Sequence, residues 1–90
     1  MRELPVIFRI MSGEVFALFP TVPHDTSGHY CVSYTHVGQH GSADYHTAIA
    51  NSRPASAESY TPLLTELQEI GYNTRVVKRA TQAMHKERSR

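Results

Sequence analysis

The sequence has a single cysteine, Cys31, and no long apolar run. One cysteine cannot form an internal disulfide, and a secreted domain of 90 residues usually carries several, so we expect a reducing compartment. The longest apolar run, Val15 to Phe19, is too short to cross a bilayer, and the first residues lack the apolar stretch of a signal peptide. We therefore expect a cytoplasmic protein that does not act at a membrane.

Motifs that would identify an enzyme are also missing. The sequence contains no CxxC or HExxH motif, and its glycines lack the lysine and the spacing of a phosphate-binding P-loop. Cys31 as a nucleophile would need a lowered pKa and an oriented base, whereas a lone cysteine in mid-strand is more often a small buried residue. We expect a noncatalytic protein and assign no catalytic residue.

The charge of the chain is unevenly distributed. The net charge is +1, yet residues 75–90 contain six basic residues and one acidic residue, so the rest of the chain is acidic. Such asymmetry suits an acidic partner or nucleic acid, and a solvated, frayed terminus is the competing interpretation. Ninety residues allow one domain, which we expect over residues 1–80, followed by a basic and flexible tail over residues 81–90.

The first half of the chain predicts strands. Residues 6–11 and 14–19 form two apolar runs around Ser12-Gly13, a pattern typical of a β-hairpin, and residues 30–37 alternate as a third strand. The first two strands are apolar at nearly every position, which indicates a central place or cover on much of both faces. Residues 20–28 are rich in turn-forming residues and predict an exposed loop.

The second half predicts two helices and a strand. Ser42 is a candidate N-cap for a helix over residues 43–51, and a second helix begins near Ser56 and ends at Gly71. The second helix has an apolar stripe formed by Tyr60, Leu63, Leu64, Leu67 and Ile70. Residues 72–79 alternate as a charged edge strand. The expected fold is α+β, with a small antiparallel sheet in the order ββ-β-αα-β and two helices packed on one face.

The polar segment from His36 to Ser42 is the first candidate for a binding site. Gly38 and Gly41 allow a sharp turn into the expected helix, whose free N–H groups would attract an anion. The competing interpretation is a plain strand-to-helix turn that needs glycine for its geometry and serine for the cap. Together with the basic residues near the C-terminus, the candidate ligand- or partner-binding residues are His36, Gln39, His40, Gly41, Ser42, Arg75, Lys78 and Arg79.

Histidine and cysteine gather between residues 29 and 46. Zinc takes four ligands of these types, so an alternative is a zinc site formed by His29, Cys31, His36 and His40, with His46 nearby. The spacing matches no established zinc motif, and hydrogen-bonded residues of a surface loop explain the histidines better. We therefore expect no cofactor, with zinc as the alternative.

The leading hypothesis is a small noncatalytic binding or regulatory module whose partner is a protein or a second copy of the chain. Its surface would combine the segment 36–42 with the edge strand near Arg75. An alternative is a nucleic-acid-binding accessory protein, in which Arg75, Lys78 and Arg79 contact phosphates. Tyr30, Tyr34 and Tyr72 would stack on bases if they faced solvent, although no known nucleic-acid-binding motif is present.

Four further segments are distinctive when they are taken together. They are Phe16-Ala17-Leu18-Phe19-Pro20, the run from Tyr34 to Gly41 (YTHVGQHG), Ser52-Arg53-Pro54 and Gly71-Tyr72. In these segments the chain resembles a family of short uncharacterised proteins of bacterial genomes and mobile elements. The likeness covers most of the chain. It implies a bacterial or phage source and assigns no activity or residue role, because the family has no known activity.

Overall fold

The computed structural model describes residues 3–24, 30–35 and 39–89 of the chain. Their sheet has the strand order β4-β3-β2-β1-β5, and β6 pairs with β1 as well. The α+β class with a small, mainly antiparallel sheet is confirmed. In chain order the elements are β1 (Leu4–Met11), β2 (Glu14–Pro23), β3 (Tyr30–Thr35), β4 (Gln39–Asp44), α1 (Tyr45–Ala50), β5 (Arg53–Pro54), α2 (Ala57–Glu69), β6 (Thr74–Val76) and α3 (Gln82–Arg88).

The predicted hairpin is confirmed between β1 and β2. Ser12 and Gly13 have φ angles of 53° and 79°, and two positive φ values are what a type I′ turn between twisted strands requires. β2 continues through Pro20 to Pro23, so the expected loop over residues 20–28 begins later than predicted. Pairing with β1 ends at Leu18, so the missing N–H of Pro20 costs no hydrogen bond to that strand.

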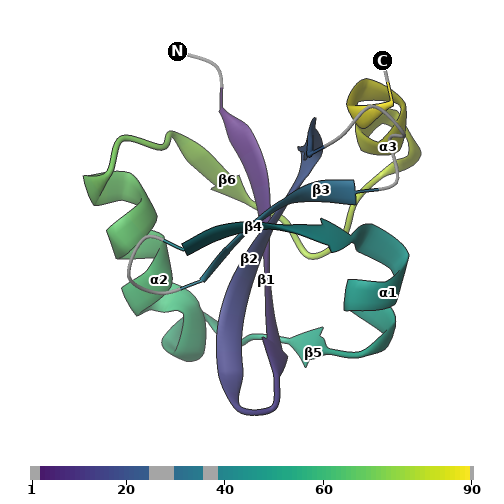
Figure 1. Ribbon diagram of the computed structural model, residues 1–90. Helices are drawn as coiled ribbons and strands as arrows, with labels where there is room; N and C mark the ends of the chain where they lie inside the picture. Colours follow the sequence, from purple (N-terminus) through teal and green to yellow (C-terminus); the bar gives the residue numbers. More distant parts are fainter. Residues whose placement is uncertain (1–2, 25–29, 36–38, 90) are drawn as a thin grey trace.

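Helices cover both faces of the sheet, which corrects the prediction of two helices on one face (Figure 1). On one face Phe8 and Phe19 pack against Leu67 of α2. On the opposite face Leu18 packs with Tyr45 of α1. The reason is visible in β1 and β2 themselves, because strands that are apolar at successive positions need cover on both sides.

Helix α2 begins and ends close to the predicted residues. The Ser56 hydroxyl caps it by accepting the N–H of Ser59 at 3.3 Å, and Gly71 follows it with a φ of 108°. The residues of the predicted apolar stripe of α2 differ in burial. Leu67 is fully buried, whereas Ile70 at the C-cap is 52% exposed because it lies beyond the edge of the sheet core.

The outer edge of β1 is covered by two short strands. β5 pairs antiparallel with the second half of β1, and β6 pairs parallel with the first half. The strand predicted over residues 72–79 is therefore shorter and parallel to its neighbour. It is short because only Thr74 to Val76 run beside β1 before the chain turns toward α3.

The C-terminal segment folds onto the sheet, so the flexible tail expected over residues 81–90 is corrected for residues 82–88, which form a helix. Thr81 caps α3 by accepting the N–H of Met84 at 3.3 Å. Arg88 is only 4% exposed, and its Nη1 donates to the carbonyl oxygen of Pro20 at 2.7 Å. The helix docks through a buried and hydrogen-bonded cation in place of an apolar stripe, which explains why hydrophobicity did not reveal it.

Every described helix is too short or too polar to span a membrane.

Candidate binding surface

The segment predicted as a loop into the first helix contains a strand. Gln39 to Asp44 form β4, which pairs antiparallel with β3 from Thr35–Gln39 to Tyr30–Asp44. His36 lies outside the described residues. Gly41 faces Ser33 across the pair, and a Cβ added to it would lie 3.3 Å from the Ser33 hydroxyl. Glycine at this position serves close strand packing, so the expectation of a turn is corrected.

The helix N-terminus also lies elsewhere than predicted. Helix α1 starts at Tyr45 with Asp44 as its N-cap, and the carboxylate of Asp44 accepts the N–H of Thr47 at 3.1 Å. Ser42 belongs to β4 and caps nothing. The anion site expected around Gly41 and Ser42 is therefore wrong, because a carboxylate of the chain itself already satisfies the helix end.

The direction of the backbone groups in β4 follows from the hydrogen bonds of β1. On the outer edge of β1 the N–H of Leu4 donates to Asn73 O at 2.8 Å, and the Phe8 carbonyl accepts the N–H of Ala55 at 3.1 Å. Even-numbered residues of β1 therefore face β5 and β6, and odd-numbered residues face β2. Successive residues of a strand direct their N–H and C=O groups to opposite sides, so this alternation can be followed through the sheet.

We followed this alternation from β1 to β4 through the register of each strand pair. It shows that the backbone groups of Gly41 are directed toward Ser33 of β3. His40 and Ser42 then direct their backbone N–H and C=O groups away from the sheet. Within the described residues β4 ends the strand order, so no strand pairs with these groups. They form an open hydrogen-bonding edge, which we call the β4 edge.

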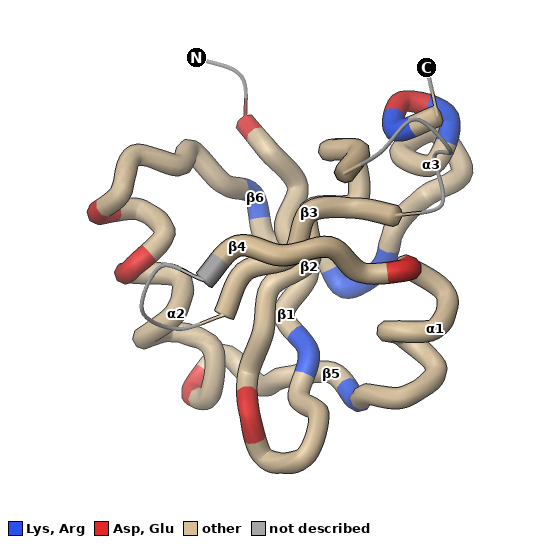
Figure 2. The backbone as a smooth tube through the Cα atoms, viewed as in Figure 1, with Lys and Arg blue, Asp and Glu red and all other residues tan. Residues whose placement is uncertain are grey.

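The β4 edge lacks the features that usually prevent strand addition. Lysine, proline and bulges protect edge strands, and β4 has none of them among its described pairs (Figure 2). Its single charged residue is Asp44 at the helix end. The opposite edge differs, since β5 contains Arg53 and Pro54, and β6 contains Arg75.

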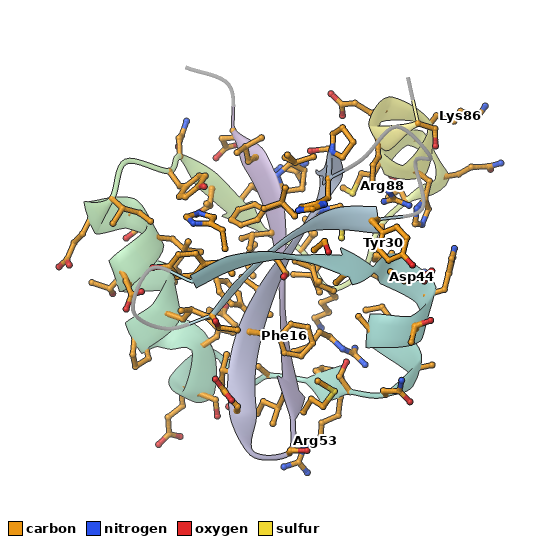
Figure 3. The ribbon with its side chains drawn as sticks, viewed as in Figure 1. Phe16, Tyr30, Asp44, Arg53, Lys86 and Arg88 are labelled. Carbon is orange, nitrogen blue, oxygen red and sulfur yellow. The ribbon has the colours of Figure 1, made fainter. Side chains whose placement is uncertain are left out.

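A hollow of about 230 Å³ lies beside β4 on the face that carries α1. We call it the α1-side hollow. It exists because α1 has only six residues and leaves part of this sheet face uncovered. In Figure 3 the Phe16 ring stands on β2 in the space between β2 and α1. The lining residues are Met11, Glu14, Phe16, Ser33, Thr35, Ser42, Ala43 and Ala48.

The side chain of His40 joins a network on the α2 face. Its Nε2 lies 2.8 Å from the Tyr72 hydroxyl, and its ring meets Tyr34 edge-on at a centroid distance of 4.8 Å. The Tyr34 hydroxyl donates to Oε2 of Glu66 in α2. Tyr34 is only 1% exposed, so the network ties β3 and β4 to α2 and leaves this phenol closed to a substrate.

Two residues of the alternative zinc set lie on opposite faces of the sheet. Cys31 packs with Leu18 on the α1 face, whereas His40 contacts Tyr34 on the α2 face, so these two side chains cannot share one ion. His29 and His36 lie outside the described residues. Among residues 3–24, 30–35 and 39–89, no three His, Cys, Asp or Glu side chains are arranged to hold a metal.

The thiol of Cys31 is poorly placed for catalysis. Cys31 is buried, and burial raises its pKa above the ordinary value, although the nearby Arg88 guanidinium acts in the opposite direction. The thiol is therefore protonated near neutral pH, and a protonated thiol is a weak nucleophile.

The candidate cations lie at the other edge of the sheet. Arg75 is in β6, which pairs with β1, and its Nε lies 3.9 Å from the Glu3 carboxylate. Lys78 and Arg79 follow β6 and are exposed. β2 and β3 separate β1 from β4, so the expected surface that combines residues 36–42 with Arg75 is not formed along one edge.

A cluster between α1 and α3 escaped the sequence analysis. The rings of His46 and His85 stack with a centroid distance of 5.4 Å, and Tyr45 meets His85 edge-on at 4.7 Å. Nη2 of Arg88 donates to Nδ1 of His85 at 2.8 Å, and the guanidinium lies 5.7 Å from the Tyr45 ring centre. The spacing of histidines along the sequence could not reveal this cluster, because His46 and His85 belong to helices that are far apart in sequence.

The surroundings of His85 make the stability of the fold sensitive to pH. Burial lowers the pKa of His85 below its ordinary value of 6.5, and Arg88 and His46 lower it further. The unfolded chain then binds this proton more readily than the folded chain. The stability contribution is complete above about pH 6.5 and is lost as the pH falls toward the lowered pKa.

We therefore expect His85→Gln to destabilise the protein more at pH 7.5 than at pH 5. Urea midpoints of the wild type and the variant across this range measure the difference. The exposed His24 provides the matched control, because it lies outside the α1–α3 cluster and its replacement by glutamine should change the midpoint little. A gap between wild type and His85→Gln that stays constant with pH would contradict the assignment.

No protein-family model matches the chain, and no significant match is found among curated proteins or solved structures. The resemblance to short bacterial and mobile-element proteins stays a prediction.

Proposed function

We propose that this protein is a noncatalytic binding module that pairs the β4 edge with an extended strand of a partner protein. The observation that supports this most directly is the outward direction of the His40 and Ser42 backbone groups, on the side of β4 where no described strand pairs with it. Main-chain hydrogen bonds to an added strand are independent of sequence, and pockets for its side chains give specificity.

The energetics favour such an addition. Each new backbone hydrogen bond contributes a net ~0.5–1.5 kcal/mol, and two outward residues offer up to four of them. β4 is already held in extended form by six register pairs with β3, so the partner binds a preformed edge. The α1-side hollow lies beside this edge and is lined in part by Ser42 and Ala43 of β4 itself.

Nucleic-acid binding is the second candidate and has weaker support. Lys78 and Arg79 are exposed, and neither forms an ion pair with another described residue. The aromatic platform expected for base stacking is not available, because Tyr34 is buried and Tyr72 stacks on Phe19 with a centroid distance of 5.1 Å. Tyr30 alone among the three is well exposed.

Ser42→Pro tests the proposed function. Proline removes the outward N–H of residue 42 but no bond to β3, so the fold should persist while strand addition is blocked. Peptides selected on the wild type from a phage-displayed library of random nine-residue sequences serve as probes. We expect Ser42→Pro to weaken their binding at least tenfold, as measured by fluorescence polarisation. Ser42→Ala keeps the N–H and should bind within about twofold of the wild type.

The other outcomes are equally informative. Selected peptides that bind Ser42→Pro as well as the wild type would refute pairing at the β4 edge, and so would a library that yields no binder. A wild type that is dimeric in light scattering, and monomeric as Ser42→Pro, would identify a second copy as the strand donor. Salt-sensitive binding of a labelled oligonucleotide that Ser42→Pro does not affect would favour the second candidate.

A further inference from the structure

We infer that the α1-side hollow receives one long apolar side chain of the strand that pairs with the β4 edge. The inference rests on the proposed function and names the chemistry of the partner, namely an extended segment with a leucine, methionine or phenylalanine anchor. Three observations support it, concerning the path over β4, the size of the hollow and its charge.

The first observation is that β4 presents little side-chain bulk between its edge and the hollow. Gly41 and Ala43 face the α1 side, because they pair with Ser33 and Cys31, and Cys31 packs on that face. Neither carries a side chain beyond a methyl group. A side chain from a strand about 4.8 Å beyond β4 can therefore lean across β4, which a larger residue at either position would prevent.

The second observation is the size and polarity of the hollow. Its volume is about 230 Å³, and apolar cavities of ~150 Å³ already take up a benzene molecule. Phe16 and Ala48 form apolar walls, and the exposed Met11 lies at the rim. Burial of one leucine-sized side chain suits these walls, whereas a polar anchor would find mainly the hydroxyls of Ser33 and Thr35.

The third observation is charge. Glu14 is the charged residue that lines the hollow, and among the described residues it forms no ion pair. An acidic anchor would be repelled by this carboxylate, whereas a neutral one is accepted. Asp44 adds a second negative charge at the end of β4, where α1 begins (Figure 2). The partner segment is therefore apolar at the anchor and not acidic beside it.

Ala48→Leu fills the hollow from α1 and provides the test. Ala50→Leu is the matched control, because Ala50 lies in the same helix and is exposed. Two peptides are compared on each protein, a library-selected peptide with its apolar anchor and the same peptide with alanine at that position. We expect Ala48→Leu to weaken the anchored peptide at least tenfold and the alanine peptide by less than twofold. Ala50→Leu should affect neither peptide.

A second measurement does not depend on strand pairing. Toluene titrated into the wild type should shift the methyl NMR signals of Ala43 and Ala48, and Ala48→Leu should abolish the shift at Ala43. Equal binding of the anchored peptide to the wild type and Ala48→Leu would overturn the anchor inference, even where Ser42→Pro still abolishes binding. Absence of toluene shifts would overturn it as well. If no peptide binds the wild type, the proposed function itself is refuted.

Discussion

Leu67→Ala is expected to lower the free energy of unfolding by about 3 kcal/mol. Leu67 has no exposed surface and packs in the core between α2 and the strands β1 and β2. Truncation removes its apolar burial and leaves a cavity that the rigid sheet can only partly close. Urea unfolding at pH 7.5, followed by circular dichroism, measures the change in midpoint and slope.

Ile70→Ala is the matched control for this change. The two residues belong to one apolar stripe in the sequence, yet Ile70 lies at the C-cap and is half exposed. Its truncation should therefore cost less than about 1 kcal/mol. Comparable losses at both positions would show that the stripe is buried along its full length, contrary to the structure.

Arg88→Met is expected to destabilise the protein by about 2–3 kcal/mol. The variant keeps much of the side-chain volume but removes the charged hydrogen bonds to the Pro20 carbonyl and to His85. A buried carbonyl that loses its donor pays its full desolvation cost. The same urea experiment detects the loss, and hydrogen exchange of the α3 amides should rise more than that of the β1 amides.

Lys86→Met separates this effect from a general loss of positive charge. Lys86 lies in the same helix and is exposed, so its replacement should change the stability by less than about 0.5 kcal/mol. In Figure 3 the two side chains diverge, since Arg88 lies beneath α3 and Lys86 points to solvent. Equal stability of wild type and Arg88→Met would mean that α3 is not docked through this arginine.

The fold class could be predicted because the local patterns are strong. The positive φ values that Ser12-Gly13 adopts are those of a short hairpin turn, and the capping residues Ser56 and Gly71 delimit α2 as expected. The placement of the helices on the sheet was harder to predict from the sequence. The apolar positions on both sides of β1 and β2 did indicate two covered faces, but a sequence does not show which helix covers which face.

The candidate site was harder to predict for a specific reason. Gly41 and Ser42 favour a turn locally, and β4 forms only because pairing with β3 overrides that preference. The burial of a cation is even harder to predict from the sequence. Arg9 donates to the carbonyl oxygens of Ile49 and Ser52 and so anchors the end of α1, yet nothing in its sequence neighbourhood distinguishes it from a surface arginine.

The two short strands on the outer edge of β1 also determine the order in which the protein can fold. The β1–β4 meander joins segments close in sequence, so it can form early, whereas Leu4 must wait for Thr74 before its outer edge is covered. During synthesis, the nascent chain therefore exposes an apolar strand edge until nearly the whole domain has left the ribosome. A strand edge exposed during that interval can pair with another chain, and β6 covers its first half once it has formed.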